Sequence, residues 1–245
     1  MKILTILGDS LATVRPEEKI ATKDLYSFKV QKELGARVYV VNRARGGNTA
    51  VKEDDLESFI FDITAAESSF FVIHLGIVDC APRIFTEYRK TLIEKWSSKR
   101  FVGRFFRYYI RKKSKNRFKL TEKKLIVYTP PADFEKHLRS ILQKILDHNP
   151  VEKVYFVNIA FPGPKMTSRT FGILEQIQKY NSLIFDIVAE HKSIAELIDV
   201  FTLTKNQPDL LLEDGHHFDP RGHDYIAREL KLRMTPLLGL SSKEN

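Results

Sequence analysis

Residues 3–11 read Ile-Leu-Thr-Ile-Leu-Gly-Asp-Ser-Leu, so a short apolar run passes directly into Gly8-Asp9-Ser10-Leu11. A run of this kind is typical of a strand that is buried on both faces of a parallel sheet. Near the other end of the chain stands Asp214-Gly215-His216-His217. Open α/β folds place their sites beyond the carboxyl ends of the strands. We therefore expect a serine after the first strand and a histidine from a late loop to meet at one rim of the sheet.

Four further apolar runs recur at the spacing of strand–helix units. The five predicted strands are 2–7, 37–41, 70–75, 153–159 and 195–200. Helical patterns over 24–34, 132–148 and 171–189, and a last one from Pro220 towards Leu232, lie between and after them. This alternation predicts right-handed crossovers and a parallel sheet with helices on both faces. We interpret 1–240 as one domain and 241–245 as a frayed C-terminal tail.

Composition and cysteine content limit the class of protein. With 43% hydrophobic and 29% charged residues, the sequence is that of an ordinary globular domain. The single cysteine, Cys80, forms no internal disulfide and suits a reducing compartment. No apolar run has the length of a membrane span, and Gly8 and Asp9 cut the first one far below a signal-peptide core. These features predict a cytoplasmic protein.

The net charge of +9 comes from one segment of the chain. Residues 99–124 hold twelve lysines and arginines against one acidic residue, Glu122. The remaining chain has 28 basic and 30 acidic residues and is therefore nearly neutral. We interpret residues 97–124 as a basic, aromatic, helical insertion in the domain.

The sequence between Arg100 and Lys119 predicts an amphipathic basic helix. At 100° per residue, Arg100, Arg104, Arg107 and Arg111 cluster within roughly 60° of arc, opposite a face of aromatic and aliphatic residues. Three roles are open for it. The helix caps the active-site cleft, lies on an anionic membrane surface as a peripheral contact at the inner face, or binds an acidic polymer such as an anionic glycan. Nucleic acid is the least favoured partner because no recognised binding module accompanies the patch.

The polar residues at the two ends of the chain fit nucleophilic catalysis. Serine is a poor nucleophile at neutral pH and needs a base, itself oriented by a third group. A turn can bring Asp214 against His217, three residues later, and so hold its imidazole in the required tautomer. We therefore predict a catalytic triad of Ser10, His217 and Asp214. The competing interpretation is an ordinary solvated loop that precedes a helix beginning at Pro220.

On these residues the chain resembles the GDSL or SGNH hydrolase family, which is named for a Ser, a Gly, an Asn and a His in four sequence blocks. Gly8-Asp9-Ser10-Leu11 is similar to the first block, Arg45-Gly46-Gly47-Asn48-Thr49 to the second, and Asp214 with His217 to the last. The resemblance implies a three-layer α/β/α, flavodoxin-like fold with five parallel strands in the order 2-1-3-4-5. It implies no metal and no organic cofactor.

The third block departs from the family pattern. The family has Gly-x-Asn-Asp where this chain has Gly76-Ile77-Val78-Asp79. The missing asparagine is normally an oxyanion donor, and valine offers none. Backbone N–H groups of Ser10 and Gly47 remain as the expected oxyanion hole, with Asn48 or Arg83 as a substitute donor. Because losing one such donor typically costs about 10²–10³ in turnover, we expect slow hydrolysis of simple esters.

The string of residues 74–83 resembles a bacterial subgroup associated with surface-polysaccharide biosynthesis, which implies acylated glycans or sugar precursors as substrates. Five residues in or next to these blocks are the expected substrate contacts: Asp9, Arg45, Asn48, Asp79 and Arg83. The two arginines are suited to a carboxylate or phosphate on the substrate, or else form surface ion pairs.

Three functions follow as hypotheses. The leading one is a serine esterase that removes an O-acyl group, acetyl above all, from a carbohydrate through an acyl-enzyme. A sugar O-acyltransferase would use the same triad. A non-catalytic glycan- or membrane-binding module is the alternative from another class, and Val78 is the one direct hint of it.

Overall fold

The computed structural model describes residues 1–64, 67–97 and 103–240. Five parallel strands form one sheet in the order β2-β1-β3-β4-β5, which confirms the predicted fold. The strands are β1 (Lys2–Gly8), β2 (Val38–Asn42), β3 (Phe70–His74), β4 (Lys153–Val157) and β5 (Ala195–Ile198). Every residue of the central strand β3 is buried, as expected for a strand covered on both faces.

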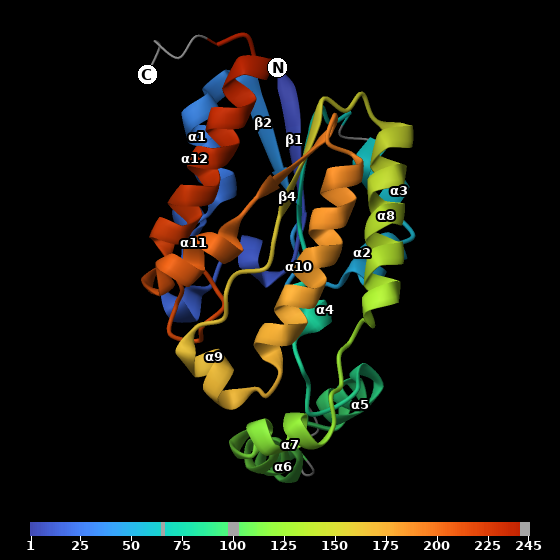
Figure 1. The fold of residues 1–245 in the computed structure, drawn as a ribbon, viewed down its shortest axis with the longest axis vertical. Helices are drawn as coiled ribbons and strands as arrows, with labels where there is room; N and C mark the ends of the chain where they lie inside the picture. Colours follow the sequence, from blue (N-terminus) through green and yellow to red (C-terminus); the bar gives the residue numbers. More distant parts are fainter. Residues whose placement is uncertain (65–66, 98–102, 241–245) are drawn as a thin grey trace.

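Helices cover both faces of this sheet, as Figure 1 shows. On one face α1 (Tyr26–Leu34) packs against α12 (Pro220–Leu237), with α11 (Val200–Asn206) nearby. On the other face α8 (Pro131–His148) contacts α10 (Ile173–Glu190), α2 (Ala50–Asp54) and α3 (Phe59–Thr64). The long helices follow the apolar periodicity of the sequence, and the result is the three-layer arrangement that was expected.

A group of helices leaves the body of the fold after α4 (Ile77–Cys80) and before α8. It consists of α5 (Glu87–Ser97), α6 (Gly103–Lys115) and α7 (Arg117–Lys123). Figure 1 shows the group at the end of the molecule towards which the parallel strands run, next to α9 (Pro164–Arg169). The group begins with α5, ahead of position 97. The charge pattern did not indicate this helix, because α5 has mixed charge and lacks the basic signature of residues 99–124. Position 100 of the predicted basic helix lies outside the described residues.

The aromatic face of α6 is only partly covered by other parts of the protein. Phe106 packs against Trp96 of α5 at a ring-centroid distance of 6.4 Å, and Tyr109 packs against Phe85 at 5.9 Å. Phe105 and Tyr108, however, are 65% and 64% exposed. Only part of the aromatic face is therefore packed against protein, while two of its rings lie in solvent.

The exposed side of α6 carries basic residues beside these two rings. Its exposed cations are Arg104, Arg107, Arg111, Lys112 and Lys115. Across residues 1–64, 67–97 and 103–240, no helix combines the length and apolarity that a membrane span requires.

Candidate active site

Ser10 follows β1 directly and occupies the first position of a 3₁₀ turn, Ser10–Ala12. The Asp9 carboxylate accepts a hydrogen bond from the Leu11 N–H at 2.8 Å and so fixes the turn. Close packing favours glycine two residues before Ser10, since a Cβ at Gly8 would lie 3.2 Å from the His74 carbonyl oxygen. The strand end therefore presents Ser10 at the carboxyl rim of the sheet, in a half-buried position.

The loop before α12 supplies the other two polar groups. Its backbone turns at Gly215, where φ is +81°, a conformation that favours glycine. Gly163 donates a hydrogen bond to the Gly215 carbonyl at 2.8 Å, and a Cβ on Gly163 would come within 2.8 Å of Gly215 Cα. Two glycines in contact thus hold the loop against the segment before α9, which brings Asp214 and His217 to the rim.

The structure brings Ser10, His217 and Asp214 together in the order expected of a triad. Ser10 Oγ lies 2.9 Å from His217 Nε2, and His217 Nδ1 lies 2.6 Å from Asp214 Oδ2. The other Asp214 oxygen accepts the backbone N–H groups of His216 and His217, each at 3.1 Å. Burial alone would raise the pKa of Asp214, but the hydrogen bonds from His217 hold it well below its usual range. The carboxylate is therefore ionised and oriented towards the imidazole.

Arg15 is a site residue that no motif in the sequence indicated. Its Nη1 lies 2.9 Å from His217 Nε2, the nitrogen that also faces Ser10, and its Nη2 pairs with Glu18 at 2.6 Å. Arg15 belongs to a loop closed by paired backbone bonds with Ile20. No spacing rule links a residue five positions after the serine to a histidine near the C-terminus.

A pocket of about 200 Å³ opens beside the serine. It is lined by Ser10, Gly47, Ile77, Val78, Ala81, Arg83, Lys90, Tyr128 and His216. Among the described residues, no hydrogen bond uses the backbone N–H of Ser10 or Gly47, the two expected oxyanion donors. The side chain of Val78 lines this pocket without a donor.

The two candidate replacements for the missing asparagine differ in position. Asn48 is buried, and its amide donates to Glu53 and to the Gly8 carbonyl, so it offers no donor to the pocket. Arg83 lines the pocket, with Nη2 3.1 Å from the Val78 carbonyl oxygen and its guanidinium 4.7 Å from the ring centre of Tyr128. Of the two, only Arg83 is placed to reach a substrate.

Three other expected substrate contacts lie elsewhere. Asp9 and Asp79 are fully buried, and Asp79 accepts the Ala50 N–H at 3.0 Å. Burial raises the pKa of Asp9 to about 8 and that of Asp79 to about 6. Arg45 pairs with the buried Glu53 at 2.7 Å. Burial keeps the Asp9 and Asp79 side chains from contacting substrate, and both hold loops around the pocket, whereas a substrate contact of the exposed Arg45 stays a prediction.

His216 contributes to the pocket wall, although its spacing ruled it out as the base. Its ring centre lies 4.0 Å from that of His217. Burial and the neighbouring His217 lower the pKa of His216 to about 4, so its ring is neutral at pH 7. A neutral imidazole beside the serine is suited to hydrogen bonding with a sugar hydroxyl.

Two clusters in the described part of the chain have three potential metal donors each. The first consists of Asp214, His216 and His217, and two of these, Asp214 and His217, already bond to each other in the triad arrangement. The second contains Asp54 and His137, but the Lys144 ammonium lies 2.7 Å from an Asp54 oxygen and opposes a cation there. Neither cluster resembles a built metal site.

Comparison with known proteins agrees with this geometry. Residues 6–225 match the model of the GDSL-like lipase/acylhydrolase family, so the chain belongs to that family and is a serine hydrolase that acts on ester bonds. No protein of curated function matches the sequence.

Solved structures share the fold at low sequence identity. A carbohydrate acetylesterase family member from Sinorhizobium meliloti is 17% identical, with 98% of this chain and 100% of that chain covered and a TM-score of 0.62. A lipase/acylhydrolase from Enterococcus faecalis is 18% identical, with 95% and 97% covered and a TM-score of 0.61. An acetylxylan esterase from Geobacillus stearothermophilus, solved as a catalytic mutant, is 17% identical, with 98% and 95% covered and a TM-score of 0.60.

Proposed function

We propose that the protein is a carbohydrate O-acyl esterase, with acetyl as the acyl group and a surface-polysaccharide glycan or its precursor as the substrate. The observation that carries this proposal is the line of contacts from Ser10 Oγ through His217 to Asp214, at 2.9 Å and 2.6 Å, beside a polar pocket. Structural neighbours that are described as carbohydrate and xylan acetylesterases support the substrate class.

In the acylation step Ser10 is the nucleophile, His217 is first the base and then the acid, and Asp214 supports His217. Ser10 Oγ attacks the ester carbonyl carbon while His217 Nε2 takes the serine proton, and ionised Asp214 stabilises the imidazolium that forms. The tetrahedral oxyanion accepts hydrogen bonds from the backbone N–H groups of Ser10 and Gly47. His217 then returns the proton to the sugar oxygen as the carbon–oxygen bond breaks, which releases the sugar alcohol and leaves an acyl-Ser10 ester.

Deacylation repeats the sequence with water. His217 removes a proton from the water as its oxygen attacks the acyl carbonyl, and the proton passes to Ser10 Oγ when the acyl-enzyme collapses. The products are the free acid and the original serine. Arg83 is the third donor in this proposal, because its guanidinium lines the pocket where valine has replaced the family asparagine.

Acetate release from O-acetylated sugars tests the proposal. The wild-type protein should release acetate from acetylated xylose or glucose, whereas Ser10→Ala should release none above the uncatalysed rate while melting at almost the same temperature. A folded wild-type protein that releases no acetate from a panel of acetylated mono- and oligosaccharides would argue for the binding-module alternative.

A sugar O-acyltransferase remains the second candidate, because His216 and Lys90 line the pocket and give a sugar hydroxyl groups to bind. The two activities differ only in the acceptor that attacks acyl-Ser10. Adding unacetylated sugar during turnover and measuring acetylated product against free acetate separates them.

We further propose that α6 brings the enzyme to an anionic membrane surface where its glycan is assembled. Support comes from the exposed rings of Phe105 and Tyr108, which lie among exposed basic residues of the same helix. Aromatic rings insert at such interfaces while cations face the headgroups. The cap role is weaker on this view, since among the aromatic rings of α6 itself (Gly103–Lys115) Phe106 and Tyr109 pack against α5 and Phe85 while the other two are exposed.

A further inference from the structure

A second pocket adjoins the serine pocket and has a different chemistry. Its volume is about 120 Å³, and its lining consists of Arg83, Arg117, Lys165, Met166, Arg169, Thr170, Asp214 and His216. Arg83 and His216 also line the pocket at Ser10, so the two spaces share a wall. A substrate with its ester at Ser10 would therefore have the second pocket directly beside it.

The basic side chains of this second pocket come from three parts of the fold. Arg83 follows α4, Arg117 begins α7, and Arg169 ends α9, next to Lys165 on the same helix. Across the described ranges, none of the three arginines has a carboxylate within ion-pair distance, whereas Lys165 pairs with Glu213 at 2.7 Å on the surface. Three guanidinium groups without a carboxylate partner among the described residues therefore line one small pocket.

The arrangement carries an electrostatic cost in the absence of an anion. Burial, together with the charges of Arg83 and Arg169, lowers the pKa of Arg117 to about 10. The Nε–H groups of Arg83 and Arg117 are buried without a hydrogen-bond partner among the described residues. Like charges and unused donors of this kind are unfavourable unless a ligand neutralises and satisfies them.

The pocket is nonetheless held in shape by contacts outside it. Arg117 Nη2 donates to the Pro82 carbonyl at 2.8 Å, which ties α7 to the loop that carries Arg83. The Phe171 N–H donates to Thr121 Oγ1 at 3.0 Å, and the Phe118 and Phe171 rings meet edge to face at 5.6 Å. These bonds fix α7 against the end of α9, and those of Arg117 to Pro82 and of Arg83 to Val78 position two of the three guanidinium groups before any ligand arrives.

One acidic residue, Asp214, also faces the pocket. Both of its oxygens are already engaged, Oδ2 by His217 and Oδ1 by two backbone N–H groups. With Lys165 paired to Glu213, three arginines still outweigh that single negative charge. A carboxylate ligand would be matched by one bidentate arginine, whereas a phosphate carries up to two charges and three acceptor oxygens. The number of cations favours phosphate.

We propose that this pocket, defined by Arg83, Arg117 and Arg169, binds a phosphate group of the acylated sugar substrate, so that the enzyme acts on acylated sugar phosphates. This inference rests on the proposed esterase function for the position of the ester. Binding of phosphate itself does not depend on catalysis, so the two ideas fail separately.

Calorimetric titration with inorganic phosphate tests the site directly, with acetate at equal ionic strength as the carboxylate probe. Wild-type protein should bind phosphate more tightly than acetate. Arg117→Met and Arg169→Met should each weaken phosphate binding about tenfold or more, the loss expected for a charge-assisted hydrogen bond. Arg37→Met is the matched control, because Arg37 is exposed and adjoins the start of β2 at the opposite end of the sheet. If Arg117→Met does not fold, Arg169→Met, at an exposed position, and the conservative Arg117→Lys still test the site.

Absence of phosphate binding to the folded wild-type protein would overturn the inference, and so would either of two further results. One is phosphate binding that neither substitution weakens, and the other is acetate binding as tight as phosphate and lost in the same variants. With an active esterase, the ratio of kcat/KM for an acetylated sugar phosphate to that for the neutral acetylated sugar should also fall in Arg169→Met. Labelled Ser10 with no phosphate binding would leave the esterase proposal standing and remove this one.

Discussion

Arg15 and Ser10 face the same atom of His217: the Arg15 Nη1 and the Ser10 Oγ each lie 2.9 Å from Nε2. A neutral imidazole nitrogen has one lone pair, so the two donors compete for it. While Arg15 occupies that lone pair, the lone pair is not available to accept the proton of Ser10. In this arrangement Arg15 restrains the base.

We therefore predict that Arg15→Leu increases the reactivity of Ser10. The second-order rate of labelling by a fluorophosphonate should rise by about tenfold, the change that corresponds to about 1.4 kcal/mol. Glu18→Gln, which removes the partner of Arg15 at 2.6 Å, should have a smaller effect. A large fall in the Arg15→Leu rate would show instead that Arg15 holds His217 in its working position.

The oxyanion hole gives a second prediction. On a small neutral ester such as 4-nitrophenyl acetate, Arg83→Met should lower kcat by about 10²–10³ if its guanidinium replaces the missing donor. Val78→Asn in the Arg83→Met background should recover part of the rate, since Val78 lines the same pocket as Ser10 and Gly47. If Arg83→Met leaves kcat unchanged, the two backbone N–H groups suffice and the substitute-donor account is wrong.

The buried Asp9 carboxyl makes stability depend on pH in a defined direction. Its pKa is raised from 3.8 to about 8 by burial, so between these values the folded protein binds a proton that the unfolded chain has lost. The free energy of unfolding should therefore fall as pH rises from about 4 to 8. Asp9→Asn keeps an oxygen for the Leu11 N–H but removes the titration.

Thermal unfolding at several pH values checks this prediction. Asp9→Asn should melt above the wild type at pH 8 by roughly 2–4 °C for each kcal/mol recovered, and the difference should shrink towards pH 4. Asp186→Asn is the control because Asp186 is exposed on α10. Equal melting curves of Asp9→Asn and wild type at every pH would contradict a protonated Asp9.

The proposed membrane contact of α6 depends on its charges. Changing Arg104, Arg107 and Arg111 to Gln together should remove up to about 3 kcal/mol of binding to anionic vesicles, at about 1 kcal/mol per basic residue. Co-sedimentation should show strong binding of wild type to anionic vesicles at low salt and weaker binding at high salt. A matched triple change of Lys23, Lys32 and Arg37, which are exposed near α1, should have little effect. Equal binding to neutral vesicles, or none to anionic ones, would defeat the proposal.

The strands and the long helices could be predicted from the sequence because each leaves a local pattern. Buried parallel strands are continuous apolar runs, and the predicted ranges agree with the observed strands to within two residues at each end. The short helices α2, α4 and α9 leave no such pattern, since four to six residues do not complete two turns of apolar periodicity. Their positions depend on packing against helices distant in the sequence: α2 contacts α8, α4 contacts α10, and α9 contacts α7.

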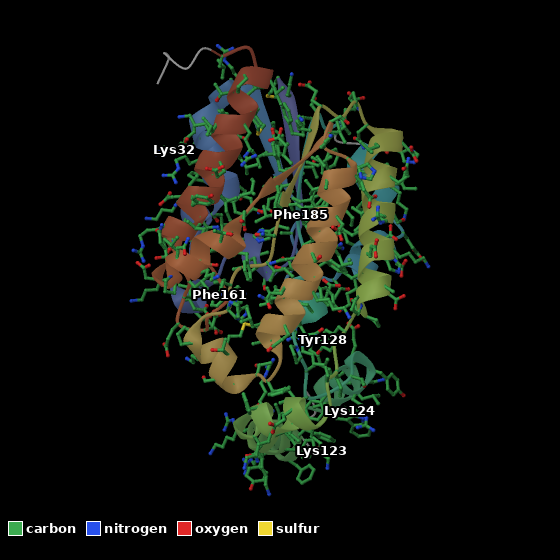
Figure 2. All side chains as sticks on the ribbon, in the orientation of Figure 1. Lys32, Lys123, Lys124, Tyr128, Phe161 and Phe185 are labelled. Carbon is green, nitrogen blue, oxygen red and sulfur yellow. The ribbon has the colours of Figure 1, made fainter. Side chains whose placement is uncertain are left out.

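Some residues of the site could likewise be predicted from the sequence, and others could not. Ser10, Asp214 and His217 could be chosen because nucleophile, base and orienting group occupy short motifs with fixed spacing. Asp9 and Asp79 stand in those motifs too, yet hydrogen bonds to the backbone turn them inward, which spacing does not encode. Arg117 and Arg169 line one pocket because α7 and α9, which are distant in the sequence, are in contact in the folded chain. Figure 2 shows Tyr128, which lies under the Arg83 guanidinium, where the chain returns from α7 towards α8.

The central claim is that Ser10 is an activated nucleophile, and covalent labelling tests it most directly. Folded wild-type protein should react with a fluorophosphonate probe, and peptide mass mapping should place the adduct on Ser10. His217→Ala should react far more slowly, and Ser27→Ala, which changes a buried serine of α1, should leave the adduct on Ser10. Absence of an adduct on folded wild-type protein, or an adduct on another residue, would contradict the account.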